Sequence, residues 1–232
     1  MITFPIFDKA KEEDRSVLTE FESKEVLKKA GIPVVETRLA KTREEAARLS
    51  REIGFPVAIK IASPDVIHKS DSGGVRLNLN TIEEVKSAFD DMIKRVNQQY
   101  PHAVIHGVSV QKMLLPGTEV IVGTSKDPQF GPVIMFGLGG IFVEVLKDVS
   151  FRIIPVDQRD AQEMISEIKG YLLLQGYRGK EPANIAALME MILKISNLVE
   201  ENPEIKELEL NPIFAYGDRA VAVDARILLE KS

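Results

Sequence analysis

The stretch Val57-Ala58-Ile59-Lys60-Ile61-Ala62 leads into a polar loop over residues 63–74 and then into Val75-Arg76-Leu77-Asn78-Leu79. Both flanking segments have the composition and the alternation of β-strands. Alternation places Lys60 on one strand face with two alanines, while the larger apolar residues share the other face. Small neighbours leave room for a ligand oxygen beside the ammonium group. A solvent-facing lysine fits the same pattern equally well.

The loop contains His68-Lys69-Ser70-Asp71-Ser72-Gly73-Gly74. Its glycines allow backbone N–H groups to approach a phosphate, and a carboxylate from Asp65 or Asp71 could fix the tautomer of the histidine. These residue types together favour a phosphate-handling loop. Taken alone, such a loop is more often a surface loop with an incidental histidine.

Outward from this stretch, the first half of the chain alternates helix and strand patterns. Thr42 with Glu45 and Thr81 with Glu84 form capping-box signatures that open two helices. Beyond about residue 101, strands follow one another across Pro/Gly turns, which is typical of antiparallel sheets.

We therefore expect an α+β fold, within the α/β class broadly, built as two lobes. The first lobe is predicted over residues 20–108 and the second over residues 109–232. Residues 1–19 are charged and lack periodicity, so we expect them to form an N-terminal arm. A ligand commonly binds in the cleft of such a pair of lobes.

The C-terminal strands carry the most specific pattern. In Glu207-Leu208-Glu209-Leu210-Asn211-Pro212 the acidic and amide residues alternate with leucines, so Glu209 and Asn211 share a face. Gly217-Asp218 suits a two-residue turn, and folding about it places Asn211 opposite Asp224. Two carboxylates and an amide oxygen are ligands that suit Mg²⁺. An exposed acidic hairpin face is the alternative.

Other chemical signals are weaker or missing. Gly137-Leu138-Gly139-Gly140 is compatible with a turn or with an oxyanion cradle, and Arg152 with a phosphate contact or with a strand-edge role. The sequence has no P-loop, serine nucleophile elbow, kinase catalytic loop or His-Glu-x-x-His motif.

Composition excludes several classes of protein. The 232 residues include 30 Lys+Arg, 35 Asp+Glu and no Cys, for a net charge of -5. The absence of cysteine removes disulfides and thiolate sites, and the mild acidity argues against a nucleic-acid binder. Because we find neither a signal-peptide pattern nor a membrane-spanning run, we expect a cytoplasmic protein with no membrane partner.

Together these motifs resemble an ATP-grasp domain, specifically the β subunit of the ADP-forming acetyl-CoA synthetases. The His-Lys-Ser-Asp-x-Gly-Gly loop is the distinguishing element, and the resemblance spans nearly all of the chain after residue 20. It rests on Lys24–Pro33, Phe55–Lys60, His68–Val75, Gln111-Lys112-Met113 with Gly117-Thr118-Glu119, Phe136–Gly140, and Glu207–Pro212 with Asp224.

The resemblance implies a nucleotide held between two lobes of an ATP-grasp fold and assigns roles to individual residues. Lys60 is expected to bind the nucleotide phosphates, and the loop glycines are expected to line the cofactor site. His68 resembles a histidine that relays phosphate, with Asp71 and Arg152 as catalytic candidates. The further cofactor-binding candidates are Gln111, Lys112 and Met113 (backbone contacts to adenine), Glu119, Gly73, Gly74, Gly139 and Gly140. Glu209, Asn211 and Asp224 would hold Mg²⁺.

The reaction implied is acyl-CoA + ADP + phosphate ⇌ acid + CoA + ATP. A CoA-binding α subunit would be the partner, in an α2β2 heterotetramer. Three alternatives stay open: a non-catalytic nucleotide-binding or assembly subunit, an ATP-grasp carboxylate–amine ligase, and a β subunit like that of succinyl-CoA synthetase. The sequence does not distinguish ATP/ADP from GTP/GDP, identify the acyl group, or give the physiological direction.

Overall fold

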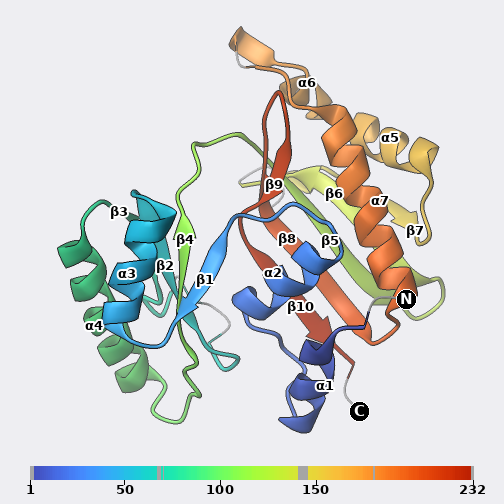
Figure 1. The fold of residues 1–232 in the computed structure, drawn as a ribbon. Coiled ribbons are helices and arrows are strands. Elements are labelled where there is room, and N and C mark those ends of the chain that lie inside the picture. Colours follow the sequence, from blue (N-terminus) through green and yellow to red (C-terminus); the bar gives the residue numbers. More distant parts are fainter. Residues whose placement is uncertain (1–2, 67–68, 70, 141–145, 180, 231–232) are drawn as a thin grey trace. The chain divides into compact units, whose positions relative to one another are not determined.

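The computed structural model (Figure 1) describes residues 3–66, 69, 71–140, 146–179 and 181–230. The chain divides into two compact units, which we call the smaller and the larger unit. The smaller unit is formed by residues 19–21 and 35–115, and the larger unit by residues up to 18, 22–34 and 116 onward. Each unit combines an antiparallel sheet with helices, and the predicted α+β class is confirmed.

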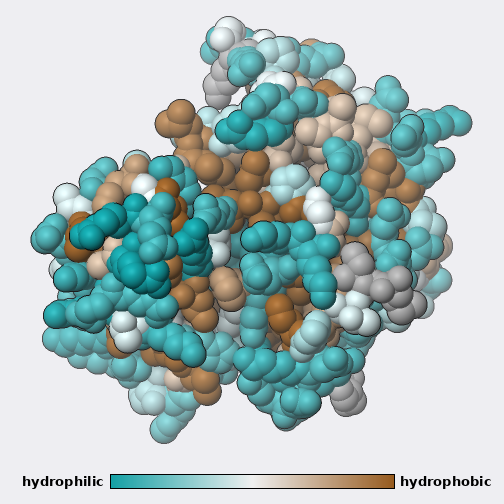
Figure 2. Space-filling view, viewed as in Figure 1, coloured by the Kyte–Doolittle hydropathy of each residue, from teal (hydrophilic) through white to brown (hydrophobic). Residues whose placement is uncertain are grey.

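The described part of the smaller unit is a sheet with two helices. Figure 1 shows the helices side by side, and Figure 2 shows that their visible surface is largely hydrophilic. The strand order is β1 (Thr37–Ala40), β4 (Gly107–Lys112), β2 (Val57–Ala62) and β3 (Val75–Leu79), and the helices are α3 (Arg43–Ile53) and α4 (Ile82–Gln99).

Both helices of the smaller unit begin where the capping signatures predict. The Thr42 side chain accepts a hydrogen bond from the Glu45 N–H at 3.1 Å, and Thr81 accepts one from Glu84 at 3.1 Å. Helix α3 ends at Gly54, whose φ of 85° is easily adopted only by glycine.

The larger unit is built on a longer antiparallel sheet. Its order is β10 (Ala225–Leu229), β8 (Ile205–Ala215), β5 (Thr118–Asp127), β6 (Gly131–Leu138) and β7 (Val149–Ile153), with β9 (Ala220–Ala222) also paired to β8. The helical segments that belong to this unit are α1 (Pro5–Glu12), α2 (Glu20–Lys29) from Glu22 on, α5 (Gln158–Glu167), α6 (Tyr171–Leu174), η2 (Tyr177–Gly179) and α7 (Ile185–Glu201).

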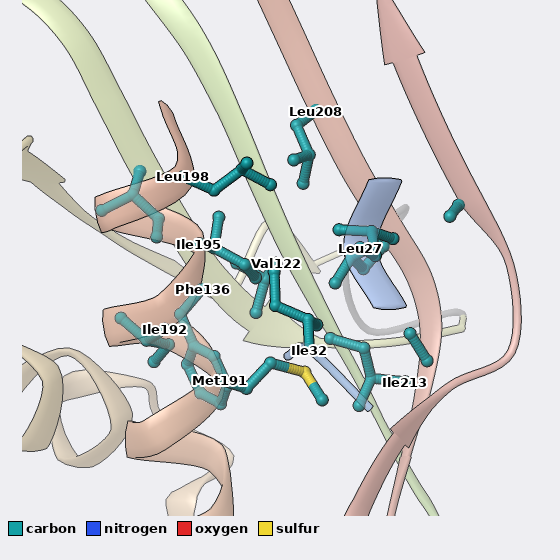
Figure 3. Packing of buried hydrophobic residues seen from close by; sticks show 14 of the residues in the cluster. Leu27, Ile32, Val122, Phe136, Met191, Ile192, Ile195, Leu198, Leu208 and Ile213 are labelled. Atoms are coloured by element: carbon teal, nitrogen blue, oxygen red, sulfur yellow. The ribbon is translucent and has the colours of Figure 1, made fainter. Parts of the chain in front are cut away.

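The core of the larger unit lies between its sheet and its helices. Figure 3 shows Ile195 and Leu198 of α7 near Val122 and Phe136 of the sheet, with Leu27 of α2 in the same cluster. Burying large apolar side chains in this way is the main stabilising contribution to such a fold. No helix within the described residues is long and apolar enough to span a membrane.

Several predicted boundaries are corrected by the structure. The expected limit at residues 108/109 falls inside β4, and the units instead change at Leu115/Pro116. The predicted arm over residues 1–19 is wrong over its described part, because Phe4 and Phe7 are buried in the core of the larger unit. The short elements α1, α6 and β7 were not predicted. Helix α7 begins directly after Asn184, whose side chain caps it.

Candidate nucleotide site

Lys60 lies in a strand that is buried on both faces. All six residues of β2 are buried, and Lys60 itself is 5% exposed. The solvent-facing alternative is therefore wrong. Its Nζ atom lies 2.8 Å from Oε1 of Glu20. A buried ammonium group keeps its charge only if such partners are present.

Glu20 was not predicted as a site residue, although it joins the predicted site residue Lys60 to Lys69 of the predicted loop. Its second carboxylate oxygen, Oε2, accepts a hydrogen bond from Nζ of Lys69 at 2.8 Å, and the Glu20 side chain is 2% exposed. An acidic residue in the first turn of a helix is common in sequences. Because 40 residues separate Glu20 from Lys60, no local pattern links the two.

The glycine end of the predicted loop packs closely on β2. The Gly74 carbonyl accepts the Ile61 N–H at 2.7 Å, and the Gly74 N–H is donated to the Lys69 carbonyl at 2.7 Å. A Cβ atom at position 74 would lie 2.7 Å from Cγ2 of Ile61. Gly73 has a φ of 68°. Both glycines are thus required by the local backbone.

The structure describes Asp65 and Asp71 of this loop but not the catalytic candidate His68. His68 lies outside the described residues. Asp65 accepts the backbone N–H of Val104 at 2.7 Å, so one of its oxygens is engaged in holding another loop. Asp71 lines a cavity of about 520 Å³ together with Ser72, Gly73, Arg95, Gln98 and Gln99.

The predicted adenine-binding segment is firmly integrated into the sheet of the smaller unit. Gln111 is 2% exposed and lies across from Thr37 of β1 and Ala58 of β2. The Lys112 Nζ atom donates to the Gly54 carbonyl at 3.0 Å, and the Met113 N–H is donated to the Pro56 carbonyl at 3.1 Å. The backbone contact to adenine stays a prediction.

In the larger unit, Glu119, Gly139 and Gly140 come together. The Gly139 N–H is donated to the Glu119 carbonyl at 2.8 Å. A Cβ atom at position 140 would lie 3.3 Å from Oε2 of Glu119. These three residues, predicted from separate motifs, therefore form one local cluster.

The C-terminal hairpin has the predicted register. The Tyr216 N–H is donated to the Arg219 carbonyl at 2.8 Å, which closes the turn at Gly217-Asp218. Ala215 pairs with Ala220, and Leu210 pairs with Ala225. These two pairs belong to one continuous register. In that register Asn211, the residue after Leu210, lies across from Asp224, the residue before Ala225.

The polar residues of this hairpin share one face. Leu208 and Leu210 are buried, whereas Glu209, Asn211 and Asp224 are partly exposed. The Asn211 Nδ2 atom donates to Oε1 of Glu209 at 3.2 Å, and Oδ1 of Asp224 accepts the Ala225 N–H at 2.8 Å. Among the described residues no three His, Cys, Asp or Glu side chains gather as a metal site. A cation here would be bound through two carboxylates and one amide.

Arg152 is engaged by carboxylates of α5. Its guanidinium donates to both carboxylate oxygens of Glu167, at 2.9 and 2.5 Å, and to Glu163 at 3.4 Å. The pKa of the Glu167 carboxyl is lowered by the hydrogen bonds from Arg152. The structure therefore gives Arg152 a role in joining β7 to α5, and its catalytic role stays a prediction.

Comparison with known proteins identifies the fold family. Residues 9–229 match the sequence profile of an ATP-grasp domain. The chain belongs to the ATP-grasp family. Within this family it is 54% identical over 224 residues to the acetate–CoA ligase (ADP-forming) I subunit beta of Pyrococcus furiosus, a match that covers 97% of this chain and 96% of the relative.

Solved structures of an acetyl-coenzyme A synthetase match nearly the whole chain. An acetyl-coenzyme A synthetase from Candidatus Korarchaeum cryptofilum, in complex with coenzyme A and Ca-AMPCP, has a TM-score of 0.94 and 50% identity, covering 97% of this chain and 99% of the other. A second structure of that enzyme, with coenzyme A and Mg-AMPPCP, has a TM-score of 0.86 and 46% identity with the same coverage, and its phosphohistidine segment points towards the nucleotide site. The predicted family is confirmed.

Proposed function

We propose that this chain is the nucleotide-binding β subunit of an ADP-forming acyl-CoA ligase. With its partner it would catalyse acyl-CoA + ADP + phosphate ⇌ acid + CoA + ATP. The observation that carries the proposal is the end-to-end match, at 54% identity, to a subunit of an ADP-forming acetate–CoA ligase. The predicted loop and hairpin residues are present in that matched span.

Phosphate chemistry is assigned to the smaller unit. Lys60 is a buried cation in β2, the strand that leads into the loop carrying His68. In the ATP-forming direction, His68 would attack a phosphohistidine of the partner, so that the partner's P–N bond breaks as a P–N bond to His68 forms. Attack by ADP would then break the P–N bond and form the new P–O bond of ATP. The neutral imidazole is the nucleophilic form in this exchange.

Glu209, Asn211 and Asp224 fit a magnesium ion by their chemistry. All three offer oxygen ligands, two of them anionic, from one face of a hairpin whose register is fixed. When bound, Mg²⁺ neutralises phosphate charge and orients the phosphate chain. A solved relative contains Mg-AMPPCP, which supports this assignment.

We assign the rest of the nucleotide to Gln111, Lys112 and Met113 and to the cluster of Glu119, Gly139 and Gly140. The nucleobase contact is proposed through backbone groups, so these side chains do not select ATP/ADP over GTP/GDP. The substrate is a soluble nucleotide of the cell interior, and this favours the cytoplasm as its location.

A partner polypeptide follows from the name of the Pyrococcus relative, which is a subunit beta. We assign CoA binding and the acyl chemistry to that partner, an α subunit, because this sequence lacks a dinucleotide-type glycine fingerprint. An α2β2 heterotetramer is the assembly we propose. Light scattering of the co-purified complex would measure its mass against the 25.8 kDa of this chain.

Reconstitution with the partner tests the function. We expect ATP to form from acetyl-CoA, ADP and phosphate only when both subunits are present. Nucleotide binding without any turnover would indicate a non-catalytic module. An acyl phosphate trapped only with an acid and an amine acceptor would indicate a carboxylate–amine ligase. Succinyl-CoA replacing acetyl-CoA as the preferred substrate would indicate the succinyl-CoA synthetase-like alternative.

A further inference from the structure

Glu20 connects the strand lysine to the loop in the smaller unit. Its Oε1 atom lies 2.8 Å from Nζ of Lys60, and its Oε2 atom lies 2.8 Å from Nζ of Lys69. The side chains of Glu20, Lys60 and Lys69 are 2%, 6% and 17% exposed. One carboxylate thus bridges two ammonium groups almost out of contact with solvent.

Such a bridge restricts the positions of the two ammonium groups. Charge-assisted hydrogen bonds are short and about twice as strong as neutral ones. They are stronger still in the protein interior, where the dielectric constant is low. A long lysine side chain otherwise samples many rotamers. By bonding both ammonium groups, Glu20 restricts Lys60 and Lys69 to defined positions.

Lys69 is held by its backbone as well as by its side chain. Its carbonyl accepts the Gly74 N–H at 2.7 Å and the Ser72 hydroxyl at 2.9 Å. Gly74 in turn bonds Ile61, the residue after Lys60. Lys69 is therefore a firmly held residue of the loop, and it directly follows His68 in the chain.

We propose that Glu20 is a positioning residue for phosphoryl transfer. It aims the Lys60 ammonium group at the nucleotide phosphates, and through Lys69 it anchors the loop that presents His68. This inference rests on the proposed function. Glu20 touches no reacting atom in this account and acts entirely through the two lysines.

Two substitutions separate the contribution of the Glu20–Lys60 contact from that of the Glu20–Lys69 contact. Glu20→Gln removes the shared charge, so both nucleotide binding and transfer should weaken, with phosphorylation of this chain by ATP slowed about tenfold or more. Lys69→Met leaves the Glu20–Lys60 pair in place. It should slow phosphorylation about as much while leaving the Kd for Mg-ADP within about twofold, and Lys69→Arg should recover much of the rate.

Glu22→Gln is the matched control. Glu22 lies two residues further along the same helix and forms a largely buried ion pair with Arg15, at 3.0 Å, in which both side chains are 11% exposed. This variant should lose stability to a comparable extent but keep both the phosphorylation rate and the Kd for Mg-ADP. Equal effects of Glu20→Gln and Glu22→Gln on these two quantities would overturn the inference.

The use of two variants keeps the inference testable even if one of them does not fold. If Glu20→Gln is unfolded by circular dichroism, Lys69→Met decides the question alone, and an unchanged phosphorylation rate there overturns the inference. Failure of the proposed function is a different result, because then the wild-type complex itself neither binds Mg-ADP nor becomes phosphorylated. That result would overturn both proposals together.

Discussion

At the residue scale, the buried ammonium group of Lys60 pairs with Glu20, and we propose that it also binds the nucleotide phosphates. Lys60→Ala should lower the affinity for Mg-ADP about ten- to hundredfold, since a charge-assisted bond contributes about 1.5–3 kcal/mol. The same substitution should lower the free energy of unfolding by about 1.5–3 kcal/mol, because Glu20 loses one of its two lysines. Calorimetry and urea unfolding measure the two effects.

Lys126→Ala is the control for Lys60→Ala. Lys126 forms an ion pair with Glu230 at 2.8 Å, but both side chains are about a third or more exposed. Loss of this ion pair should lower the free energy of unfolding by no more than about 1 kcal/mol and leave the affinity for Mg-ADP unchanged. Unchanged Mg-ADP affinity in Lys60→Ala would reduce Lys60 to a structural residue.

Gly74 shows how a single backbone contact constrains the loop. In Gly74→Ala the new Cβ would lie 2.7 Å from Ile61 Cγ2 and 3.0 Å from the Lys69 carbonyl oxygen. We expect a loss of stability of about 1–3 kcal/mol from this overpacking. Gly123→Ala would meet the flexible end of Met135 at 3.3 Å and the Leu208 carbonyl oxygen at an ordinary 3.8 Å, so it should be nearly neutral. Equal melting temperatures for the two variants would contradict the close packing of the loop.

At the scale of elements, the C-terminal hairpin is the proposed metal-binding element. Asp224→Asn removes one of its two anionic ligands and should raise the Mg²⁺ concentration needed for half-maximal ADP binding by about tenfold or more. Asp218→Asn, in the exposed turn of the same hairpin, should not change this concentration. Nucleotide binding titrated against Mg²⁺ makes the comparison. An unaltered Mg²⁺ requirement in Asp224→Asn would rule out the proposed ligand set.

The strand β7 and the helix α5 are joined by ion pairs that depend on pH. The pKa of Glu163 is lowered from 4.5 chiefly by its hydrogen bond from Arg159, and that of Glu167 is lowered by Arg152. A lowered folded-state pKa gives a stabilisation that is present above about pH 4.5 and is lost as the pH falls through the folded value.

Arg152→Gln should therefore be less stable than wild type at pH 7, and the difference should narrow as the pH is lowered below about 4.5. Because the glutamates are exposed, the effect is modest. Melting temperatures measured from pH 7 to pH 3 test it. A difference that persists undiminished at pH 3 would mean that Arg152 stabilises the unit by packing rather than by charge. Loss of phosphorylation at full stability would instead support the catalytic role predicted for Arg152.

At the scale of the whole molecule, local signals predicted most of the elements correctly. The threonine caps, Gly54 and the turn at Gly217-Asp218 act within a few residues, and the structure follows them. The hairpin register could be predicted because it depends only on the turn and on strand alternation. The role of Glu20 could not, because its two contacts span 40 and 49 residues.

The boundaries between the units were missed for the same reason. Residues 8–15 are mostly charged and hide the signal, yet Phe4 at the N-cap of α1 and Phe7 within it are buried in a core made mostly by residues after 116. Helix α2 begins with residues of the smaller unit and continues in the larger unit, so a division by consecutive sequence segments does not describe it. Long-range burial of this kind leaves no local pattern.

The most direct test of the account is the position of phosphate on this chain. The complex with its partner would be incubated with Mg²⁺ and γ-³²P-labelled ATP, and the labelled residue of this chain identified by mass spectrometry. We expect an acid-labile phosphohistidine at His68, and in His68→Asn no label, no ATP synthesis and unchanged Mg-ADP binding. Synthesis of ATP retained in His68→Asn would contradict the account, because phosphate would then pass to ADP without a relay on this subunit.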